Sequence, residues 1–509
     1  MLPDPVSSSS PALRPAPLHC RLQARLQAHL QALTQGLLER DTAARLLLLA
    51  ALAGEHVLLI GPPGTAKSEL ARRLHRVFDG ARYFERLLTR FSTPEELFGP
   101  LSLKALEDDR YERLIDGYLP TAGIAFLDEV FKANSAILNA LLTLLNEREF
   151  DNGAGRLHTP LISVIGASNE PPADDSLAAF HDRFLLRVPV APVSAGAFAA
   201  LLCLGDVTGD VTEGGRVNGL ADGLAHSATP APAPITAAER AALTAARNAV
   251  ALGDEALAAL TALRGVADAL GLTVSDRRWR QLLALMRCAA ASEGRATLDA
   301  LDLWLVPYVL SADAQSVPAL SAWVTDSLVQ AVAQPLPWLH AAVAAFERQL
   351  DLEQRLPADD TEPALDASAG KLALALALGG GADGSGVAGD AGLQRLRPAT
   401  LEARQRRAFS PVHVAARLAQ VAALSRRAEA ARASVQAAHN ALASQLAQRL
   451  WLPPTLGQGW LGAHAQTLAT LAGLQARLAL LAGTEAGFAA LRVDDSLPEV
   501  SPAPVLLDR

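Results

Sequence analysis

The segment "LLIGPPGTAKSEL", residues 58–70, constrains the fold of this chain more than any other. An apolar run leads into a Gly/Pro-rich turn, and Lys67 and Ser68 open a stretch that favours a helix. This order follows the pattern G-x-x-x-x-G-K-[ST] of phosphate-binding loops, except that Ala66 stands where the pattern has glycine. The added methyl group is tolerable if the backbone of Ala66 keeps a negative φ. The segment therefore predicts a strand, a variant phosphate loop and a helix.

A loop of this kind binds an anion through its main chain. Consecutive backbone N–H groups at the start of a helix form a concave anion site, which the helix dipole strengthens. Lys67 would bring its charge to the β- and γ-phosphates of ATP, and Ser68 would give a hydroxyl ligand to Mg²⁺. The expected nucleotide-binding residues of the loop are Gly61, Pro62, Pro63, Gly64, Thr65, Ala66, Lys67 and Ser68.

Two further apolar runs lead to polar residues that suit hydrolysis. "GIAFLDEV" reaches Asp128, which would hold Mg²⁺ directly or through water, and Glu129, which would orient and deprotonate the attacking water. "LISVIGASNE" reaches Asn169, whose uncharged amide would hold the water or the γ-phosphate without competing for the metal. Together with Lys67, these residues predict a site that hydrolyses ATP.

The remaining pattern predicts an α/β core followed by helices. Four short apolar runs alternate with helical stretches over residues 18–195: "HVLLI", "GIAFLD", "LISVIGAS" and "FLLRVPV". This alternation is typical of a parallel sheet covered by helices. Alanine and leucine are abundant and aromatic residues make up only 5% of the chain, which favours a largely helical remainder. We expect a disordered Pro/Ser-rich tail over 1–17, a helical lid over 196–330 with a flexible excursion over 205–234, and a C-terminal region over 331–509.

The C-terminal region carries two apolar stripes at helical spacing. One stripe runs from Val414 to Leu446 and the other lies within residues 461–483, so an antiparallel helical hairpin is the simplest arrangement. Packing within the hairpin would explain both stripes, and a face that docks a partner is the alternative. The alternation in "KLALALAL" and the Gly-rich run after it predict a small β-containing insert over 360–400.

Composition excludes several classes of protein. The net charge of −8 and the isoelectric point near 5.8 argue against a broad basic surface for nucleic acid. Cys20, Cys203 and Cys288 lack metal-ligand spacing and are expected to be reduced thiols. The N-terminus lacks the apolar stretch of a signal peptide, and the apolar run over 44–61 is interrupted by a Gly-Glu-His sequence. We expect a cytoplasmic protein without a transmembrane segment.

The order of "GPPGTAKS", "FLDEV", "ASNE", "DRF" and "SDRRWR" resembles the AAA+ ATPases, and within them the MoxR family. "RFSTPEELFGP", "GYLP" and "KANSAILNALLTLLNEREFDNG" are most similar to its RavA-like branch. The resemblance covers about residues 18–310 and includes the Ala-Lys-Ser end of the loop. It implies an α/β P-loop NTPase (AAA+) core with a parallel sheet and an all-α lid, with ATP and Mg²⁺ as cofactors. It also implies a homo-hexamer.

The resemblance assigns roles to further residues. Asn169 matches sensor 1, and Arg183 matches the arginine finger that reaches the γ-phosphate of the neighbouring subunit. Arg277 matches sensor 2 in the lid, with the adjacent Arg278 as the alternative. Residues 97–121 match the helix-two insert and "REFDNGAGRLHTPLIS" matches the hairpin before sensor 1. In such rings both segments usually line the pore.

For function, the resemblance implies a Mg²⁺-dependent ATPase of chaperone type that remodels a client or helps to insert a cofactor or metal. Such proteins typically act with a partner that carries a von Willebrand factor A (VWA) domain. A nucleotide-gated scaffold with little turnover is the alternative, which the intact Lys67, Glu129 and Arg183 disfavour. A nucleic-acid-associated AAA+ motor is the second alternative. The insert "LSLKALEDDRYERLIDGYLP" carries at least as many acids as bases, so we expect no stable nucleic-acid binding.

Overall fold

A computed structural model describes residues 18–153, 155–170, 177–203, 232–311, 316–333, 335–355 and 407–505. The chain divides into two compact units: Met1–Leu328 with Ser444–Trp460, and Val329–Ala443 with Leu461–Arg509. Residues 444–460 fall within the predicted C-terminal region, yet they pack with the first unit. The predicted tail, nearly all of the excursion and the predicted β-containing insert lie outside the described residues.

The first unit is built on a five-stranded parallel sheet with the strand order β2-β3-β6-β1-β7. The four apolar runs of the sequence form four of these strands, which confirms the predicted α/β core. The fifth, β2, was not marked by an apolar run, because most of its side chains are exposed at the edge of the sheet. The strands are β1 (Val57–Ile60), β2 (Tyr83–Leu87), β3 (Ile124–Asp128), β6 (Ser163–Ser168) and β7 (Leu186–Pro189).

The order of the strands brings three carboxyl ends together. β6 lies between β3 and β1, and Ile60 at the end of β1 pairs with Ser168 at the end of β6. In open parallel sheets, ligands bind outside the carboxyl ends of the strands. The segments that follow β1, β3 and β6 therefore meet at one edge of the sheet. This is the edge at which the sequence predicts the nucleotide.

Helices cover the sheet, and one of them is buried on almost every side. Nine of the 13 residues of α2 (Asp41–Ala53) are buried and none is exposed, and the helix ends at Gly54, which has a φ of 75°. The chain then enters β1, so the apolar run over 44–61 is a helix and a buried strand, as predicted. Within the described residues, no helix has the length and apolarity needed to cross a membrane. The other helices of the core are α1 (Leu18–Thr34), α3 (Lys67–Leu74), α6 (Ser135–Glu147) and the short α7 (Ala178–His181).

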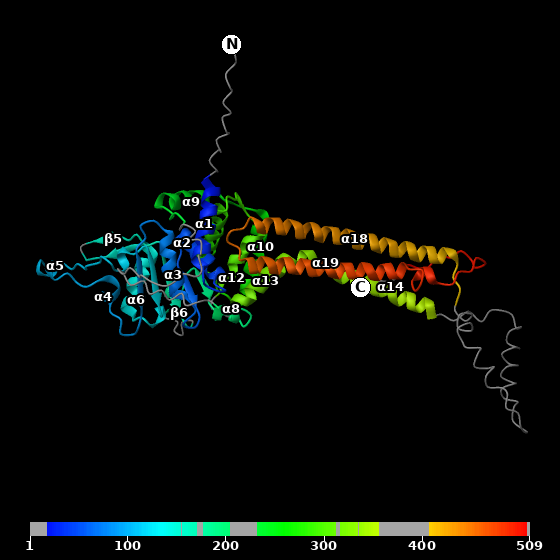
Figure 1. Ribbon diagram of the computed structural model, residues 1–509, viewed down its shortest axis with the longest axis horizontal. Helices are drawn as coiled ribbons and strands as arrows, with labels where there is room; N and C mark the ends of the chain where they lie inside the picture. The colour runs from blue at the N-terminus through cyan, green and yellow to red at the C-terminus, as the bar shows by residue number, and fades with distance from the viewer. Residues whose placement is uncertain are drawn as a thin grey trace, which may run out of the picture. The chain divides into compact units, whose positions relative to one another are not determined.

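The two predicted inserts lie at the same end of the first unit, where Figure 1 shows α5 and β5. The first insert, predicted over 97–121, begins at the end of α4 (Pro94–Phe98) and contains α5 (Leu103–Glu107). The second is an antiparallel hairpin of β4 (Glu149–Asp151) and β5 (Arg156–His158). Asn152 in the hairpin accepts a hydrogen bond from the N–H of Arg113 at 2.8 Å and donates one to its carbonyl at 3.3 Å. The two inserts are therefore tied to each other.

The lid follows as a set of helices, which confirms its predicted class. α11 (Asp276–Ser292) packs against α9 (Ala237–Ala249) and against α2 of the core. A two-residue parallel pair, β8 (Ala251–Leu252) with β9 (Thr297–Leu298), is the one departure from an all-α lid within the described residues. The remaining α-helices within the predicted lid, residues 196–330, are α8 (Phe198–Cys203), α10 (Asp254–Ala269), α12 (Val306–Leu310) and most of α13 (Ser316–Ala333).

Three long helices form the second unit: α14 (Pro335–Arg355), α18 (Pro411–Ala447) and α19 (Pro454–Ala482). Figure 1 shows them side by side. The two apolar stripes of the sequence pack into one buried cluster with α14, so the stripes form core, as the simpler interpretation had it. The cluster includes Val343, Phe346, Val421, Leu424, Val435, Leu471, Leu474 and Leu478.

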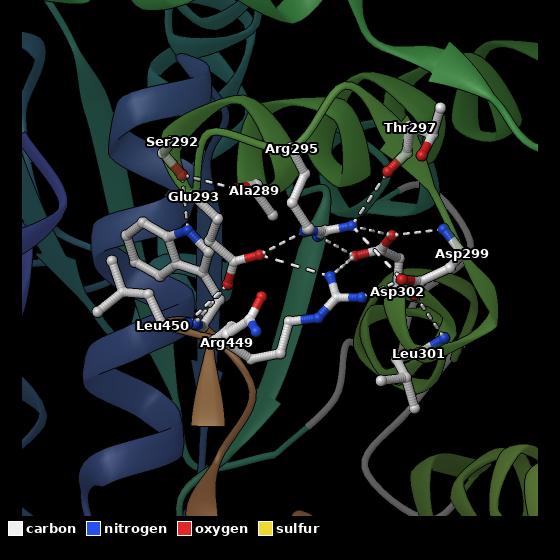
Figure 2. A network of polar contacts seen from close by, with 12 residues as sticks. Ala289, Ser292, Glu293, Arg295, Thr297, Asp299, Leu301, Asp302, Arg449 and Leu450 are labelled. Carbon is white, nitrogen blue, oxygen red and sulfur yellow. Dashed lines mark hydrogen bonds and ion pairs between the residues drawn. The ribbon is translucent and has the colours of Figure 1, made fainter. Parts of the chain in front are cut away.

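The turn between α18 and α19 is held to the lid by buried ion pairs (Figure 2). The side chain of Arg449 is only 5% exposed and pairs with Asp302 at 3.2 Å, with Glu293 at 3.5 Å and with Asp299. Arg295 pairs with Glu293 at 2.8 Å and with Asp302 at 2.5 Å. The two most buried acids thus each have two guanidinium partners, which compensates for taking four charges out of water.

Backbone and indole donors complete this contact. Glu293 Oε1 accepts the N–H of Leu450 at 2.7 Å, and the indole N–H of Trp451 donates to Ser292 Oγ at 2.7 Å. Trp451 is buried. The turn is therefore fixed by direction-specific bonds in addition to apolar packing.

Replacing Arg449 by alanine should release this turn from the lid. Glu293 and Asp302 keep Arg295 but lose their second cation, and removing one partner of a buried ion pair costs about 3–5 kcal/mol. Hydrogen exchange at residues 448–453 should accelerate and the melting temperature should fall. Arg432→Ala, at an exposed position in the middle of α18, is the matched control and should change little. Unchanged exchange in the Arg449 variant would contradict the importance of the ion pairs.

Candidate nucleotide site

The phosphate loop connects β1 to α3, and its first glycine is required by packing. The N–H of Gly61 donates to the carbonyl of Ser168 at 3.0 Å, which continues the pairing of β1 with β6. A Cβ atom on Gly61 would lie 2.1 Å from the carbonyl oxygen of Val190. Gly64 has a φ of 78°, a conformation that side chains rarely adopt. The loop thus has the backbone geometry for which its glycines were predicted.

The prediction for Ala66 was wrong. Its φ is 63° and its ψ is 27°, so an alanine stands in the left-handed region immediately before the helix. The backbone of Ala66 keeps this conformation because Lys67, the next residue, begins α3 directly after the loop. For a residue with a Cβ atom, this conformation costs roughly 1–2 kcal/mol. The loop therefore stores strain at the position where the pattern has glycine.

Lys67 is a buried cation within the loop. It is 7% exposed, and its Nζ donates to the carbonyl of Gly61 at 2.5 Å and to that of Pro62 at 2.9 Å. Burial lowers the pKa of Lys67, and the negative charges of Asp128 and Glu129 oppose this shift. No carboxylate of the described residues lies within ion-pair distance of Lys67 Nζ. A buried ammonium group bound to carbonyl oxygens fits a site that receives an anion.

Arg40, which belongs to no motif, forms a hydrogen bond with the main chain of the phosphate loop. Its Nε donates to the carbonyl of Thr65 at 2.9 Å, and its Nη2 donates to that of Ala191 at 2.8 Å, just after β7. The side chain is buried, and burial lowers its pKa. Thr65 itself donates to the carbonyl of Pro62 at 3.0 Å. Because Arg40 lies outside the loop in the sequence, no spacing rule could identify it.

The polar residues that follow β3 and β6 meet beside the loop. Asn169 Nδ2 donates to Glu129 Oε1, and Asp128 Oδ1 accepts the N–H of Glu129 at 3.0 Å. Lys132, also missed from sequence, places its Nζ 3.4 Å from the other oxygen of Glu129. Glu129 has a φ of 53°, so a second residue of the site adopts the left-handed conformation. Such strain tends to gather at functional sites.

Ser68 and Asp128 are the residues that would hold Mg²⁺. Ser68 is in the first turn of α3 and Asp128 ends β3, both with partly buried side chains. Oxygen ligands suit this ion, which usually takes one or two protein groups together with phosphate oxygens and waters. The described residues contain no cluster of three or more His, Cys, Asp or Glu that would form a separate metal site. The donor set therefore fits a metal that arrives with a nucleotide.

Arg277 does not lie beside its own phosphate loop. Its side chain contacts Asn146 Oδ1 at 3.5 Å, near the end of α6. It also lies close enough to Glu55 to lower the pKa of that carboxyl, which burial raises to about 7. Glu55 stands just before β1, whereas the phosphate loop follows β1. β1 spans about 13 Å. Arg277 therefore lies at the amino ends of the strands, and the loop lies at their carboxyl ends.

Arg183 lies near the same edge as Arg277. Its N–H bonds to the carbonyl of Phe180 at 3.0 Å, and two residues later the N–H of Leu185 bonds to the carbonyl of His56 at 3.1 Å, just before β1. Within the described part of the chain, the buried Nε of Arg183 has no hydrogen-bond partner. The structure thus brings together Lys67 and the acidic and amide residues, and it leaves both arginines elsewhere.

Replacing Ala66 by glycine should relieve the strain in the loop. The relief of about 1–2 kcal/mol exceeds the cost of about 0.4–1 kcal/mol from the more flexible unfolded chain. We expect a gain of up to about 1 kcal/mol in the free energy of unfolding, measured by denaturant titration. Ala242→Gly, at an exposed position within α9, is the matched control and should lose about 0.5–1 kcal/mol. A loss of stability in both variants would contradict the strain.

Comparison with known proteins agrees with this architecture. Residues 24–217 match the family model described as the MoxR domain in the MoxR-vWA-beta-propeller ternary systems. Residues 255–324 match the model of an AAA lid domain. The RavA-like branch is a narrower assignment than these descriptions give, and it stays a prediction.

Three relatives each match about 30% of this chain. Two uncharacterized proteins of Methanocaldococcus jannaschii are each 56% identical over 151 residues, which is 30% of this chain and 40% of theirs. The protein MoxR of Paracoccus denitrificans is 31% identical over 166 residues, which is 30% of this chain and 48% of that protein. The chain thus spans less than half the length of these relatives. The matches over the core and the lid support a MoxR-family AAA+ ATPase.

Proposed function

We propose that this protein hydrolyses ATP to ADP and phosphate in a Mg²⁺-dependent reaction. The observation that carries the proposal is the meeting of Lys67, Asp128, Glu129 and Asn169 at the adjacent carboxyl ends of β1, β3 and β6. A cation for phosphate, an acid for metal and a carboxylate–amide pair for water are the parts that phosphoryl transfer requires.

Each side chain has a distinct role in the reaction. Asn169 and Glu129 hold a water, and Glu129 accepts its proton as the oxygen attacks the γ-phosphorus and the bond to the β-phosphate oxygen breaks. Lys67 exchanges its carbonyl partners for phosphate oxygens and stabilises their charge. Ser68 and Asp128 would hold Mg²⁺, which would supply further charge neutralisation. Because Asn169 and Lys132 both contact Glu129, this carboxylate must give up part of these contacts to face the water.

The position of the arginines supports a ring, and we propose a homo-hexamer. Arg183 and Arg277 lie away from the phosphate loop of their own chain, so each would act on a nucleotide held by a neighbouring subunit. The two side chains would then serve as arginine finger and sensor 2. In this arrangement an isolated subunit has an incomplete site.

We further propose a chaperone-like role in the cytoplasm with a VWA-domain partner. The description of the matching family model, which names MoxR-vWA-beta-propeller ternary systems, supports this partner and adds a β-propeller protein as a candidate third component. The switch driven by hydrolysis would remodel a client or help to insert a cofactor or metal. The acidic balance of the first insert disfavours a nucleic-acid motor.

Glu129→Gln should lower kcat by about 10²–10⁴-fold, the usual contribution of a general base, while ATP binding persists. Lys67→Ala should instead abolish binding. The assay is phosphate release, with binding followed by a fluorescent ATP analogue. Glu147→Gln, an exposed acid at the end of α6, is the control and should leave kcat unchanged. Wild-type turnover in the Glu129 variant would contradict the proposal, and negligible turnover in the wild-type protein would favour a nucleotide-gated scaffold.

Two inactive variants should restore activity when mixed. Arg183→Ala keeps the phosphate loop, and Lys67→Ala keeps the arginines, so a mixed ring contains some complete interfaces. Phosphate release from an equimolar mixture should exceed the sum of the two separate rates. A chain that carries both substitutions, mixed with Lys67→Ala, contains no complete interface and should remain inactive. If Arg183→Ala alone hydrolyses ATP normally, the proposed role of Arg183 is wrong.

A further inference from the structure

Arg278, one residue after Arg277, is fully occupied within its own chain. It is 4% exposed, and its Nε donates to the carbonyl of Val309 at 2.6 Å. Its Nη1 donates to Asp182 Oδ1 at 2.8 Å, and its Nη2 donates to the carbonyls of Phe184 at 3.2 Å and Leu185 at 2.9 Å. All three guanidinium nitrogens thus have partners. The choice between Arg277 and Arg278 as sensor 2 therefore falls on Arg277.

The partners of Arg278 surround the predicted arginine finger. Asp182 and Phe184 are the two neighbours of Arg183 in the chain, and Leu185 follows them. One side chain of the lid helix therefore contacts the carboxylate of Asp182 before Arg183 and the backbone carbonyls of Phe184 and Leu185 after it. Burial lowers the pKa of Arg278 and the charge of Asp182 opposes the shift, so the ion pair helps to keep this buried guanidinium charged.

The same helix turn carries Arg277. Ser275 caps α11 and its Oγ accepts the N–H of Arg278 at 3.3 Å, which fixes the first turn of the helix. Arg277 thus lies within the first turn of α11, between the capping residue Ser275 and the buried Arg278. Its exposed side chain projects from a rigid base.

We propose that Arg278 is a positioning residue that sets Arg183 and Arg277 in one fixed arrangement, so that a subunit presents both to the nucleotide of its neighbour. This inference rests on the proposed function, since it assumes that both arginines act in a ring. The lid and the finger segment would then move as one body. Loss of the contacts that Arg278 makes with Asp182, Phe184 and Leu185 should misplace the two arginines without changing the subunit's own phosphate loop. A displacement of about 1 Å can lower the rate by up to 10²-fold.

Asp182→Asn is the informative variant. It removes the charge that faces Arg278 Nη1, and its side chain is 42% exposed, so the fold should tolerate it. A second hydrogen bond between β7 and the lid remains in place: Arg187 Nη1 donates to the carbonyl of Ser311 at 2.6 Å. Asp276→Asn, an exposed acid at the start of the same helix, is the matched control. The more severe Arg278→Lys should act in the same direction.

In uniform rings, Asp182→Asn should lower kcat by about tenfold while the Kd for ATP stays at the wild-type value. Asp276→Asn should leave both constants unchanged. A lowered affinity for ATP with an unchanged kcat would overturn the proposal, because the substitution would then act on the subunit's own loop.

Mixed rings test the direction of the effect. Asp182→Asn is placed either in the Lys67→Ala chain, which only donates arginines, or in the Arg183→Ala chain, which only accepts them. Restored activity should fall about tenfold in the first mixture and stay unchanged in the second. Equal losses in both mixtures, or no loss in either, would overturn this inference alone. A failure of the two parent variants to restore activity at all would overturn the proposed function, and this inference with it.

Discussion

The parallel pairing of β6 with both β1 and β3 is the constraint on which the rest of the structure depends. It places the ends of three strands side by side, and the loop, the acids and the amide of the site are the residues that follow those ends. The pairing of β1 with β6 places the segment that leads to Lys67 beside the segment that leads to Asn169, although the two are far apart in the sequence. Two residues outside the motifs also contact the site. Arg40 bonds to the main chain of the loop, and Lys132 pairs with Glu129.

The site combines rigid backbone with stored strain. Ala66 and Glu129 both adopt positive φ; the first immediately precedes Lys67 and the second immediately follows Asp128. Strained residues persist only where the surrounding structure determines their conformation. Here the start of α3 fixes one and the end of β3 fixes the other. The strained residues lie where phosphate and water would bind. Each adjoins an element of the packed core, α3 for Ala66 and β3 for Glu129.

The sequence predicted what depends on local pattern. Fully buried strands and apolar helix stripes follow simple periodicities, so β1, β3, β6, β7 and the hairpin of α18 and α19 were predicted. The edge strand β2 has a mixed pattern and was missed. The sign of φ at Ala66 was predicted wrongly, because the residue type alone favours the other region.

Contacts between distant segments were beyond the sequence. Arg449 meets Asp302, which lies 147 residues earlier, and no spacing rule links them. Arg277 and Arg278 are equivalent in the sequence, and burial alone separates them. Arg40 and Lys132 belong to no motif. In each case the partner of a charged side chain is set by the tertiary fold, and the same charge in a linear sequence indicates only a solvated surface.

The central claim is that a neighbouring subunit completes each nucleotide site. ATP turnover measured across a dilution series, with the molecular mass followed by light scattering in the same samples, tests this most directly. Turnover per subunit should fall as the assembly dissociates and should be lost in the monomer. A monomer that hydrolyses ATP at the full rate per subunit would contradict it.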